Sequence, residues 1–370
     1  MDTDAAPLVW IDCEMTGLDY QNDTIIEIAC IVTDSELNIL EKGSDIAIHQ
    51  PRAVMDAMND WCREHHGRSG LTASVLASTT SMAEAEAQVL ALVKRHCRQP
   101  RAAVLAGNSV HADRAFLARL MPELTAFLHY RIVDVSSVKE LARRWNRPVL
   151  AAAPRKALDD IIESIEELRH YKADFFKQAR AGAAPLVWID VETTGLVPDK
   201  DAILEIAMVV TDAALEPLEP AQSLVIHQPA SELAKLNTWS RKWHRKSGLL
   251  DEVEQSTLTA AAAEQRLIDQ LKRHCAAPGQ AVLAGNNVGF DRAFLDRHMP
   301  VLAAYLHFRN VDVSTVNELA KRWAPEALRG LAKRHTHRAL DDISESIREL
   351  QFYREALFRG AVRGADSSDP

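Results

Sequence analysis

Leu186-Val187-Trp188-Ile189-Asp190-Val191-Glu192 is an apolar run that ends in two carboxylates with a valine between them. The apolar run predicts a buried strand, and residues i and i+2 of a strand point the same way, so Asp190 and Glu192 share one face. Two buried carboxylates this close repel each other unless a cation lies between them. The stretch therefore predicts a core strand with a candidate metal site at its end, although a solvated strand end or a helix cap is an alternative.

The same stretch occurs earlier in the chain. Residues 8–12 repeat as residues 186–190, an offset of 190 − 12 = 178, and residues 113–117 repeat as residues 291–295 with the same offset. A period this long indicates a duplicated domain and not a solenoid. The expected organisation is one domain at 1–178, a linker at 179–185, a second domain at 186–359 and a disordered tail at 360–370.

Composition narrows the class of protein. The chain has 370 residues, of which 47% are hydrophobic and 26% charged, enough for two domains with a core each. Its formal net charge is −9, whereas proteins that grip long nucleic acid usually carry a basic excess. A nucleic-acid substrate is therefore expected to be short and held in a small pocket.

Location is read from the cysteines and from hydropathy. No apolar run approaches the ~18 residues of a membrane span, so no membrane association is expected. The five cysteines show no CxxC pairing, and the first seven residues lack the apolar stretch of a signal peptide. These features predict a reduced compartment and a cytoplasmic location.

Each copy begins with strands and continues mainly with helices. In the first copy the expected strands lie at 8–11, 25–33, 46–50 and 103–107. The last of these leads into a helix that carries Asp113, and the final helix of the second copy repeats apolar residues on one face after Asp342. Such an order indicates an α/β fold with a mixed sheet flanked by helices.

Two further acids and a histidine extend the candidate site. Asp291 begins a helix after a Gly-Asn-Asn loop, and Asp342 begins the last helix five residues after His337. A carboxylate can hold a divalent ion while a nearby imidazole takes a proton from water on that ion. Four acids from three segments predict two-metal hydrolysis of a phosphodiester with Mg²⁺ or Mn²⁺, which prefer oxygen ligands. For Asp291 and Asp342, an ordinary charge at a helix start is the alternative.

Four motifs together resemble the oligoribonuclease family. They are W-I-D-x-E-x-T-G-L, G-N-x-V-x-x-D-R-x-F-L, D-V-S-[ST]-V-x-E-L-A-[KR]-R-W and H-R-A-L-D-D-I-x-E-S. The family belongs to the DEDDh branch of 3′–5′ exonucleases, with an RNase H-like fold, and the resemblance covers nearly the whole chain twice. It implies hydrolysis of very short RNA to mononucleotides. The implied metal ligands are Asp190, Glu192, Asp291 and Asp342, with His337 as the general base.

The resemblance also implies a substrate pocket. Leu196 would wedge between the two bases of a very short RNA, with Trp239 stacking nearby and His244 close to the scissile end. The 5′ phosphate would be capped by Asn286, Asn287, Arg309 and Ser314. Asn287 departs from the serine of the family. Core packing is the alternative for Trp239, and a solvated surface charge is the alternative for Arg309.

The first copy differs at the general base. It keeps the four acids as Asp12, Glu14, Asp113 and Asp160. Arg155 stands where the second copy has His337, and the first copy is four residues shorter just before it. Because arginine stays protonated at any working pH, it cannot take a proton from water. The first copy is therefore expected to be catalytically inactive or nearly so.

A tyrosine links the two copies in this interpretation. Oligoribonuclease is a homodimer in which the tyrosine of an H-Y-R segment completes the pocket of the partner subunit. This chain has Tyr130 in the first copy and Phe308 in the second. If the copies pair as that dimer does, Tyr130 reaches the second site, and the chain is an internal pseudo-dimer that is monomeric in solution. Interchangeable packing residues, or pairing of repeats between chains, are the alternatives.

Two other functions stay open. The chain could be a DEDDh exonuclease that acts on longer RNA or on DNA, or a non-catalytic module that binds short RNA. The acidic net charge and the capped pocket argue against long substrates. The complete set of acids in the second copy argues against a module without catalysis.

Overall fold

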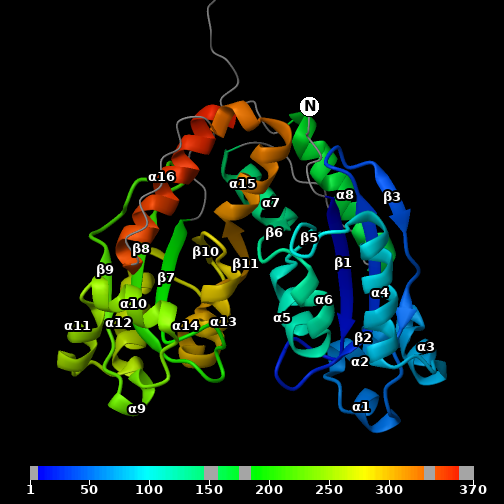
Figure 1. Ribbon diagram of the computed structural model, residues 1–370, viewed down its shortest axis with the longest axis horizontal. Helices are drawn as coiled ribbons and strands as arrows, with labels where there is room; N and C mark the ends of the chain where they lie inside the picture. Colours follow the sequence, from blue (N-terminus) through cyan, green and yellow to red (C-terminus); the bar gives the residue numbers. More distant parts are fainter. Residues whose placement is uncertain (1–6, 146–156, 175–184, 329–337, 358–370) are drawn as a thin grey trace, which may run out of the picture. The chain divides into compact units, whose positions relative to one another are not determined.

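The computed structural model describes residues 7–145, 157–174, 185–328 and 338–357 (Figure 1). The chain divides into two compact units. Unit 1 comprises Met1–Val138, Val149–Tyr171 and Asn317–Trp323, and unit 2 comprises Lys139–Pro148, Lys172–Val316 and Ala324–Pro370. Each unit thus combines most of one repeat with a short segment from the other.

Unit 1 contains a mixed sheet. Its strands are β1 (Leu8–Met15), β2 (Ile25–Thr33), β3 (Ile39–Lys42), β4 (Ile46–Ala47), β5 (Val104–Gly107) and β6 (Ile132–Asp134). The strand order is β3-β2-β1-β5-β6, and β4 pairs with β2. Strand β1 runs antiparallel to β2 and parallel to β5. The strand expected at 46–50 is shorter, and β3 was not predicted because its side chains are mostly exposed.

Helices cover this sheet. The helices of the first repeat are α1 (Arg52–Asp56), α2 (Asp60–Ser69), α3 (Leu71–Ala77), α4 (Met82–His96), α5 (His111–Leu120), α6 (Pro122–Phe127), α7 (Val135–Trp145) and α8 (Ala157–Asp174). From Lys139 onward, α7 belongs to unit 2. Helix α4 starts with a capping box in which Ser81 and Glu84 satisfy each other's backbone N–H groups. The buried faces of α4 and α5 pack over the sheet. Val93 of α4 and Phe116 of α5 lie in one hydrophobic core with Ile11 of β1.

Unit 2 repeats the architecture. Its strands are β7 (Leu186–Thr193), β8 (Ile203–Thr211), β9 (Gln222–Val225), β10 (Ala281–Gly285) and β11 (Leu306–Asp312), in the order β11-β10-β7-β8-β9. The helices of the second repeat are α9 (Ala230–Leu233), α10 (Thr238–Lys246), α11 (Leu249–Gln255), α12 (Ala260–His274), α13 (Gly289–His298), α14 (Pro300–Tyr305), α15 (Val313–Trp323), η1 (Pro325–Leu328) and α16 (Ala339–Leu357). From Asn317 onward, α15 belongs to unit 1. The prediction of a duplicated α/β fold with mixed sheets is confirmed.

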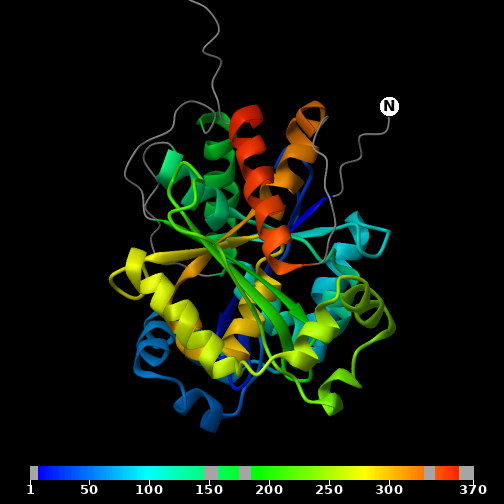
Figure 2. The same cartoon turned by 90° about the vertical axis from the view of Figure 1, so that its left-hand side faces the viewer.

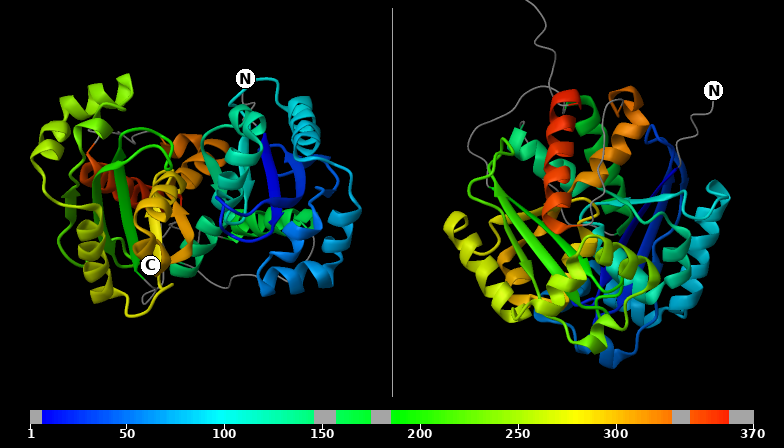
Figure 3. Two further views of the ribbon diagram at one scale, coloured as in Figure 1. Left: turned by 90° about the horizontal axis from the view of Figure 1, so that it is seen from below. Right: turned by 60° about the vertical axis from the view of Figure 1, so that its left-hand side comes forward.

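The alternation of β7 decides where the site lies. Val187, Ile189 and Val191 belong to a core cluster with Leu267 of α12 and Phe294 of α13. Because successive strand residues point to opposite faces, Asp190 and Glu192 point to the other face. Helix α16 packs on β7 and β8 there, and Figures 2 and 3 show it as the red helix beside the green strands.

None of the helices in the described ranges is long and apolar enough to cross a membrane.

Candidate active site

Three carboxylates of unit 2 converge on one point. Asp190 and Glu192 lie on β7, and Asp342 lies in the first turn of α16. One oxygen from each lies within 4.8 Å of the other two. Carboxylate oxygens at this spacing fit a hard divalent cation such as Mg²⁺ or Mn²⁺. Sequence motifs more than 140 residues apart are thus brought into one candidate metal site.

Asp291 adds a fourth acid from α13. Its side chain is buried, and Oδ1 accepts a hydrogen bond from the backbone N–H of Val191 at 3.0 Å. Val191 lies between Asp190 and Glu192, so this bond fixes the start of α13 against the acidic end of β7. The four acids that the sequence analysis selected therefore lie together.

The raised pKa values of these acids show that nearby positive charge does not offset their burial. Burial raises the pKa of Asp190 well above its ordinary value, and the charges of Asp291 and Glu192 raise it further. Burial, followed by neighbouring carboxylates, also raises the pKa of Glu192 to about 8 and that of Asp342 to about 7. Asp291 reaches about 8, mainly through burial. A bound cation favours the charged carboxylates and reverses these shifts.

A fifth carboxylate next to the site was missed in the sequence. Glu205 of β8 is the direct cross-strand partner of Glu192, and its side chain is only 1% exposed. Arg338 donates to both Glu205 oxygens, with Nε and Nη2 each at 3.0 Å. A single glutamate inside the apolar run of β8 was the available signal, because a buried glutamate needs a partner.

His244, expected near the scissile end, is buried beside the acids. Its Nε2 lies 3.0 Å from the carbonyl oxygen of Thr193, and its Nδ1 lies 3.8 Å from Glu192 Oε2. The carbonyl favours the tautomer with a proton on Nε2. His244 therefore supports the strand end that carries Glu192.

Leu196, the expected wedge, lies at the tip of a turn and is 75% exposed. The turn is tied by Asp201, whose carboxylate accepts from the backbone N–H of Val197 at 2.8 Å and from Thr194 Oγ1 at 3.3 Å. A Cβ at Gly195 would lie 2.5 Å from the Asp201 oxygens. The absence of a side chain at position 195 therefore leaves room for the Asp201 carboxylate that ties the turn.

The expected phosphate cap is a connected loop. Asn287 adopts a left-handed φ of 54°, and its backbone N–H donates to Asp312 Oδ1 and Ser314 Oγ, both at 2.9 Å. Ser314 Oγ in turn donates to Asn286 Oδ1 at 3.1 Å. Asn286 Nδ2 donates to Glu349 Oε2 of α16 at 2.8 Å. The structure brings the three cap residues together, with the Asn286 amide already engaged by α16.

Arg309 is expected at the phosphate cap, and the structure gives its guanidinium a protein partner. Its Nη1 lies 3.3 Å from Glu140 Oε1, and its guanidinium lies 5.0 Å from the ring centre of Phe308. Glu140 belongs to the α7 segment of unit 2. Arg309 can therefore reach a phosphate only by sharing or leaving this carboxylate.

Several expected residues fall outside what can be placed. His337 and Arg155 lie outside the described residues, as do the side chains of Trp239 and Asp160. Tyr130 is 55% exposed and lies in unit 1, whereas the acids lie in unit 2.

The first copy keeps much of the same local geometry. Asp12 and Glu14 lie on β1, and Asp113 Oδ1 accepts from the Cys13 N–H at 3.0 Å. Burial raises the pKa of Asp113 to about 7. Trp61, the counterpart of Trp239, is 64% exposed and stacks on His65 with ring centres 4.0 Å apart.

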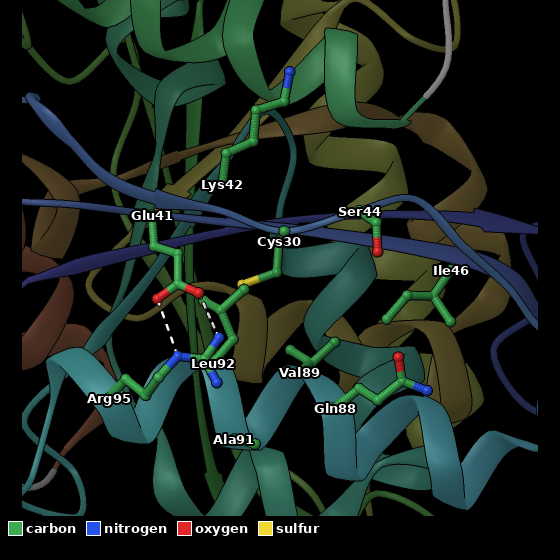
Figure 4. Close-up of a pocket in the computed structure, with 11 residues that line it drawn as sticks. Cys30, Glu41, Lys42, Ser44, Ile46, Gln88, Val89, Ala91, Leu92 and Arg95 are labelled. Atoms are coloured by element: carbon green, nitrogen blue, oxygen red, sulfur yellow. Dashed lines mark hydrogen bonds and ion pairs between the residues drawn. The ribbon is translucent and has the colours of Figure 1, made fainter.

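A pocket of about 560 Å³ lies elsewhere in unit 1, between β3 and α4 (Figure 4). Figure 4 shows Glu41 paired with Arg95 in its wall, and Arg95 and His96 hold the pKa of Glu41 at about 2. Burial raises the pKa of the lining thiol Cys30 to about 12, so the thiol stays neutral. Neither group is prepared for proton transfer or nucleophilic attack.

Comparison with known proteins assigns the family. The family model described as Exonuclease matches twice, over residues 9–168 and 187–350. The chain therefore belongs to this exonuclease family. The two matches correspond to the two repeats found in the sequence.

Curated relatives narrow the class further. The chain is 55% identical over 175 residues to the oligoribonuclease of Halorhodospira halophila, and this match covers 46% of the chain and 94% of that protein. It is 51% identical over 179 residues to the mitochondrial oligoribonuclease of Bos taurus, and this match covers 47% of the chain and 75% of that protein. The resemblance to oligoribonuclease is confirmed, and the protein is a metal-dependent exoribonuclease.

Among solved structures, exonuclease I from Methylocaldum szegediense aligns with 21% identity and a TM-score of 0.37, over 47% of this chain and 41% of that one. A likeness this distant adds nothing on substrate.

Proposed function

We propose that the protein hydrolyses very short RNA from the 3′ end to mononucleotides, with its working site in the second repeat. The observation that carries this proposal is the convergence of Asp190, Glu192 and Asp342 within 4.8 Å. Asp291 accepts the N–H of Val191, which lies between Asp190 and Glu192 in the strand. Relatives named oligoribonuclease, at 51–55% identity, support the substrate class.

The proposed mechanism assigns a role to each residue. Asp190, Glu192, Asp291 and Asp342 would hold two Mg²⁺ or Mn²⁺ ions. When bound, such ions supply a more acidic water and stabilise the charge on the leaving oxygen. His337 would take the proton from the attacking water, which fits its place five residues before Asp342. His244 holds the backbone next to Glu192 and so keeps the acids in place.

Substrate length follows from charge and from the exposed leucine. The formal net charge of −9 gives long RNA little electrostatic attraction. Leu196 offers an apolar surface for a base, and we propose Trp239 as its stacking partner and the loop of Asn286, Asn287 and Ser314, with Arg309, as the 5′ limit. These positions favour a substrate of a few nucleotides.

The first repeat is proposed to serve as scaffold. Its residues Asp12, Glu14, Asp113 and Asp160 lack a general base because position 155 is arginine. In this proposal the domains at 1–178 and 186–359 form an internal pseudo-dimer that is monomeric in solution, and Tyr130 completes the second site. A cytoplasmic location stays a prediction, since several relatives are named mitochondrial.

The direct test compares RNA of two and of twenty residues. The proposal expects release of mononucleotides from the dinucleotide at a rate well above that on the longer RNA, and loss of both activities with a chelator. Faster cleavage of the twenty-residue RNA would instead support an exonuclease for long substrates. Binding of the dinucleotide with metal but without release of mononucleotides would overturn the catalytic proposal.

A further inference from the structure

Arg338 makes two parallel ion pairs at the start of α16. One side of its guanidinium meets Glu205, as described above. Its Nη1 and Nη2 also donate to Glu252 Oε1 and Oε2, each at 2.9 Å. Glu205 and Arg338 are largely shielded, with side chains 1% and 26% exposed. A planar guanidinium suits two such forks, whereas a lysine ammonium cannot make both at once.

These bonds join three elements around the acids. Glu205 lies on β8 opposite Glu192, and Glu252 lies on α11. The backbone of α16 is tied to the same group, because the Ala339 N–H donates to Glu205 Oε2 at 3.3 Å. Arg338 O accepts the N–H of Asp342 at 3.0 Å. The position of Arg338 thus sets the first helical turn that carries Asp342.

Charge balance also supports a role for Arg338 in keeping the acids in place. Glu205 would otherwise place another buried negative charge directly across the strand pair from Glu192, which costs free energy when it has no partner. Arg338 supplies that partner, and Ser223 Oγ donates to Glu205 Oε1 at 2.7 Å. Glu192 is then left with an oxygen within 4.8 Å of the oxygens of Asp190 and Asp342.

The sequence of the first copy differs at both outer positions of this clamp. It keeps the inner carboxylate, because Glu27 pairs across the strands with Glu14. Serine stands at position 74 where Glu252 stands in the second copy, and lysine stands at position 156 in place of Arg338. Both changes accompany the replacement of His337 by Arg155. The copy without a general base has therefore also lost both outer members of the clamp.

We propose that Arg338 is a positioning residue of the active site: by clamping Glu205 and Glu252 it holds the start of α16 against β8, so that Glu192 and Asp342 keep the spacing required by a divalent ion. The inference rests on the proposed function for the identity of the site. It assigns to Arg338 and Glu252 a role in metal binding without either residue touching metal or substrate.

Mn²⁺ binding by the full chain, titrated without RNA, tests this role. All chains carry Asp113→Asn, which removes a candidate ligand of the first copy. Arg338→Lys keeps the charge but loses the double fork, and it is expected to weaken Mn²⁺ binding about 10–100-fold. Arg273→Lys is the matched control, because Arg273 also pairs with a glutamate, Glu219, but at an exposed position away from the acids. It should leave Mn²⁺ binding unchanged.

Glu252→Ser removes the second carboxylate that Arg338 pairs with and introduces the residue that the first repeat has at this position, Ser74. Because Glu252 is 47% exposed, this variant should fold, and it is expected to weaken Mn²⁺ binding in the same direction. Since both residues act through one clamp, the double variant should lose less than the sum of the single losses. With a dinucleotide, kcat should fall at fixed Mn²⁺ while KM changes little.

The outcomes separate this inference from the proposed function. Mn²⁺ binding by Arg338→Lys equal to that of the parent overturns the inference, as does an equal loss in Arg273→Lys. A parent chain that binds Mn²⁺ but does not cleave the dinucleotide overturns the proposed function, while the metal titration still decides the clamp. Absence of Mn²⁺ binding in the parent overturns both.

Discussion

Asp291 Oδ1 accepts a hydrogen bond from the Val191 N–H at 3.0 Å, so the fourth acid is tied to the backbone between the first two. The same bond joins Asp113 and Cys13 in the first copy, also at 3.0 Å. An asparagine at either position can still accept this bond through its amide oxygen. Charge and architecture can therefore be separated by one isosteric substitution.

Asp291→Asn should reduce dinucleotide hydrolysis roughly 10²-fold or more, because several kcal/mol of charge stabilisation by metal depend on the ligand set. Its melting temperature without metal, measured above about pH 8 where Asp291 is ionised, should equal or exceed that of the parent, since a buried repelling charge is removed. Asp113→Asn is the matched control and should leave turnover unchanged. Equal losses in the two variants would show that both copies catalyse.

Replacement of the proposed general base gives a second comparison. His337→Ala should slow turnover of a dinucleotide by about 10²–10⁴-fold, the usual contribution of a positioned base. Arg155→Ala should have little effect, because that position holds no group able to accept a proton. Steady-state release of mononucleotides measures both. Substantial turnover by His337→Ala would remove histidine from the mechanism.

The unequal aromatic residues give a third comparison. Tyr130 and Phe308 are both exposed, at 55% and 61%, and each stacks on the preceding histidine. Tyr130→Phe removes one hydroxyl, and we expect it to cut dinucleotide turnover far more than Phe308→Ala does. A loss of about 1–3 kcal/mol in kcat/KM would fit a lost hydrogen bond to a charged phosphate. Equal activity in the two variants would make the pair simple packing residues.

The raised pKa values predict a dependence on pH in the metal-free protein. Glu192 rises from an ordinary pKa of 4.5 to about 8, and Asp342 rises from 3.8 to about 7. An acid with a raised pKa binds more protons when folded, so its contribution to stability is full below about pH 4 and is lost as the pH rises to about 8. The melting temperature in chelator should therefore fall between about pH 5 and about pH 8.

Mg²⁺ should offset this loss, because it binds the ionised acids. We expect the rise in melting temperature on adding Mg²⁺ to be larger at about pH 8 than at about pH 5. Glu192→Gln should reduce that difference. A rise of equal size at both pH values in the parent protein would contradict the assignment of these acids as metal ligands.

The turn that carries Leu196 predicts an effect on substrate binding. A Cβ at Gly195 meets the Asp201 carboxylate at 2.5 Å, so Gly195→Ala must displace this carboxylate and weaken its hold on the turn. KM for a dinucleotide should rise while the melting temperature changes little. Gly17→Ala places the same clash against Asp23 in the first copy and should leave KM unchanged. An unchanged KM in Gly195→Ala would contradict the expectation that the Asp201-tied turn positions Leu196 for binding.

Much of the fold was available from the sequence because local patterns carry it. The apolar runs of β1 and β2 recur as β7 and β8, and their alternation placed Asp190 and Glu192 on one face. Strand β3 was missed because Ile39 and its neighbours are mostly exposed and show no regular buried face. A short edge strand is specified by its pairing with β2 more than by its own residues.

The acids were found in the sequence, whereas their surroundings were not. Arg338 and Glu205 are 133 residues apart, and no local sequence pattern predicts such a pair. The resemblance placed Asn286 at a phosphate cap but did not reveal its partners, and the structure shows its amide donating to Ser346 and Glu349. Long-range partners of this kind depend on how α16 packs on the sheet, which periodicity alone does not determine.

Each repeat contributes part of one helix, α7 or α15, to the compact unit of the other repeat, and this limits how the chain can evolve. Lys139–Pro148 is encoded in the first repeat but belongs to unit 2, where Glu140 pairs with Arg309. Mutational drift in the first repeat can therefore erase a general base without harming the second unit, but a change at Glu140 alters the second unit directly. Selection is expected to preserve α7 in the first repeat long after it has stopped preserving that repeat's own chemistry.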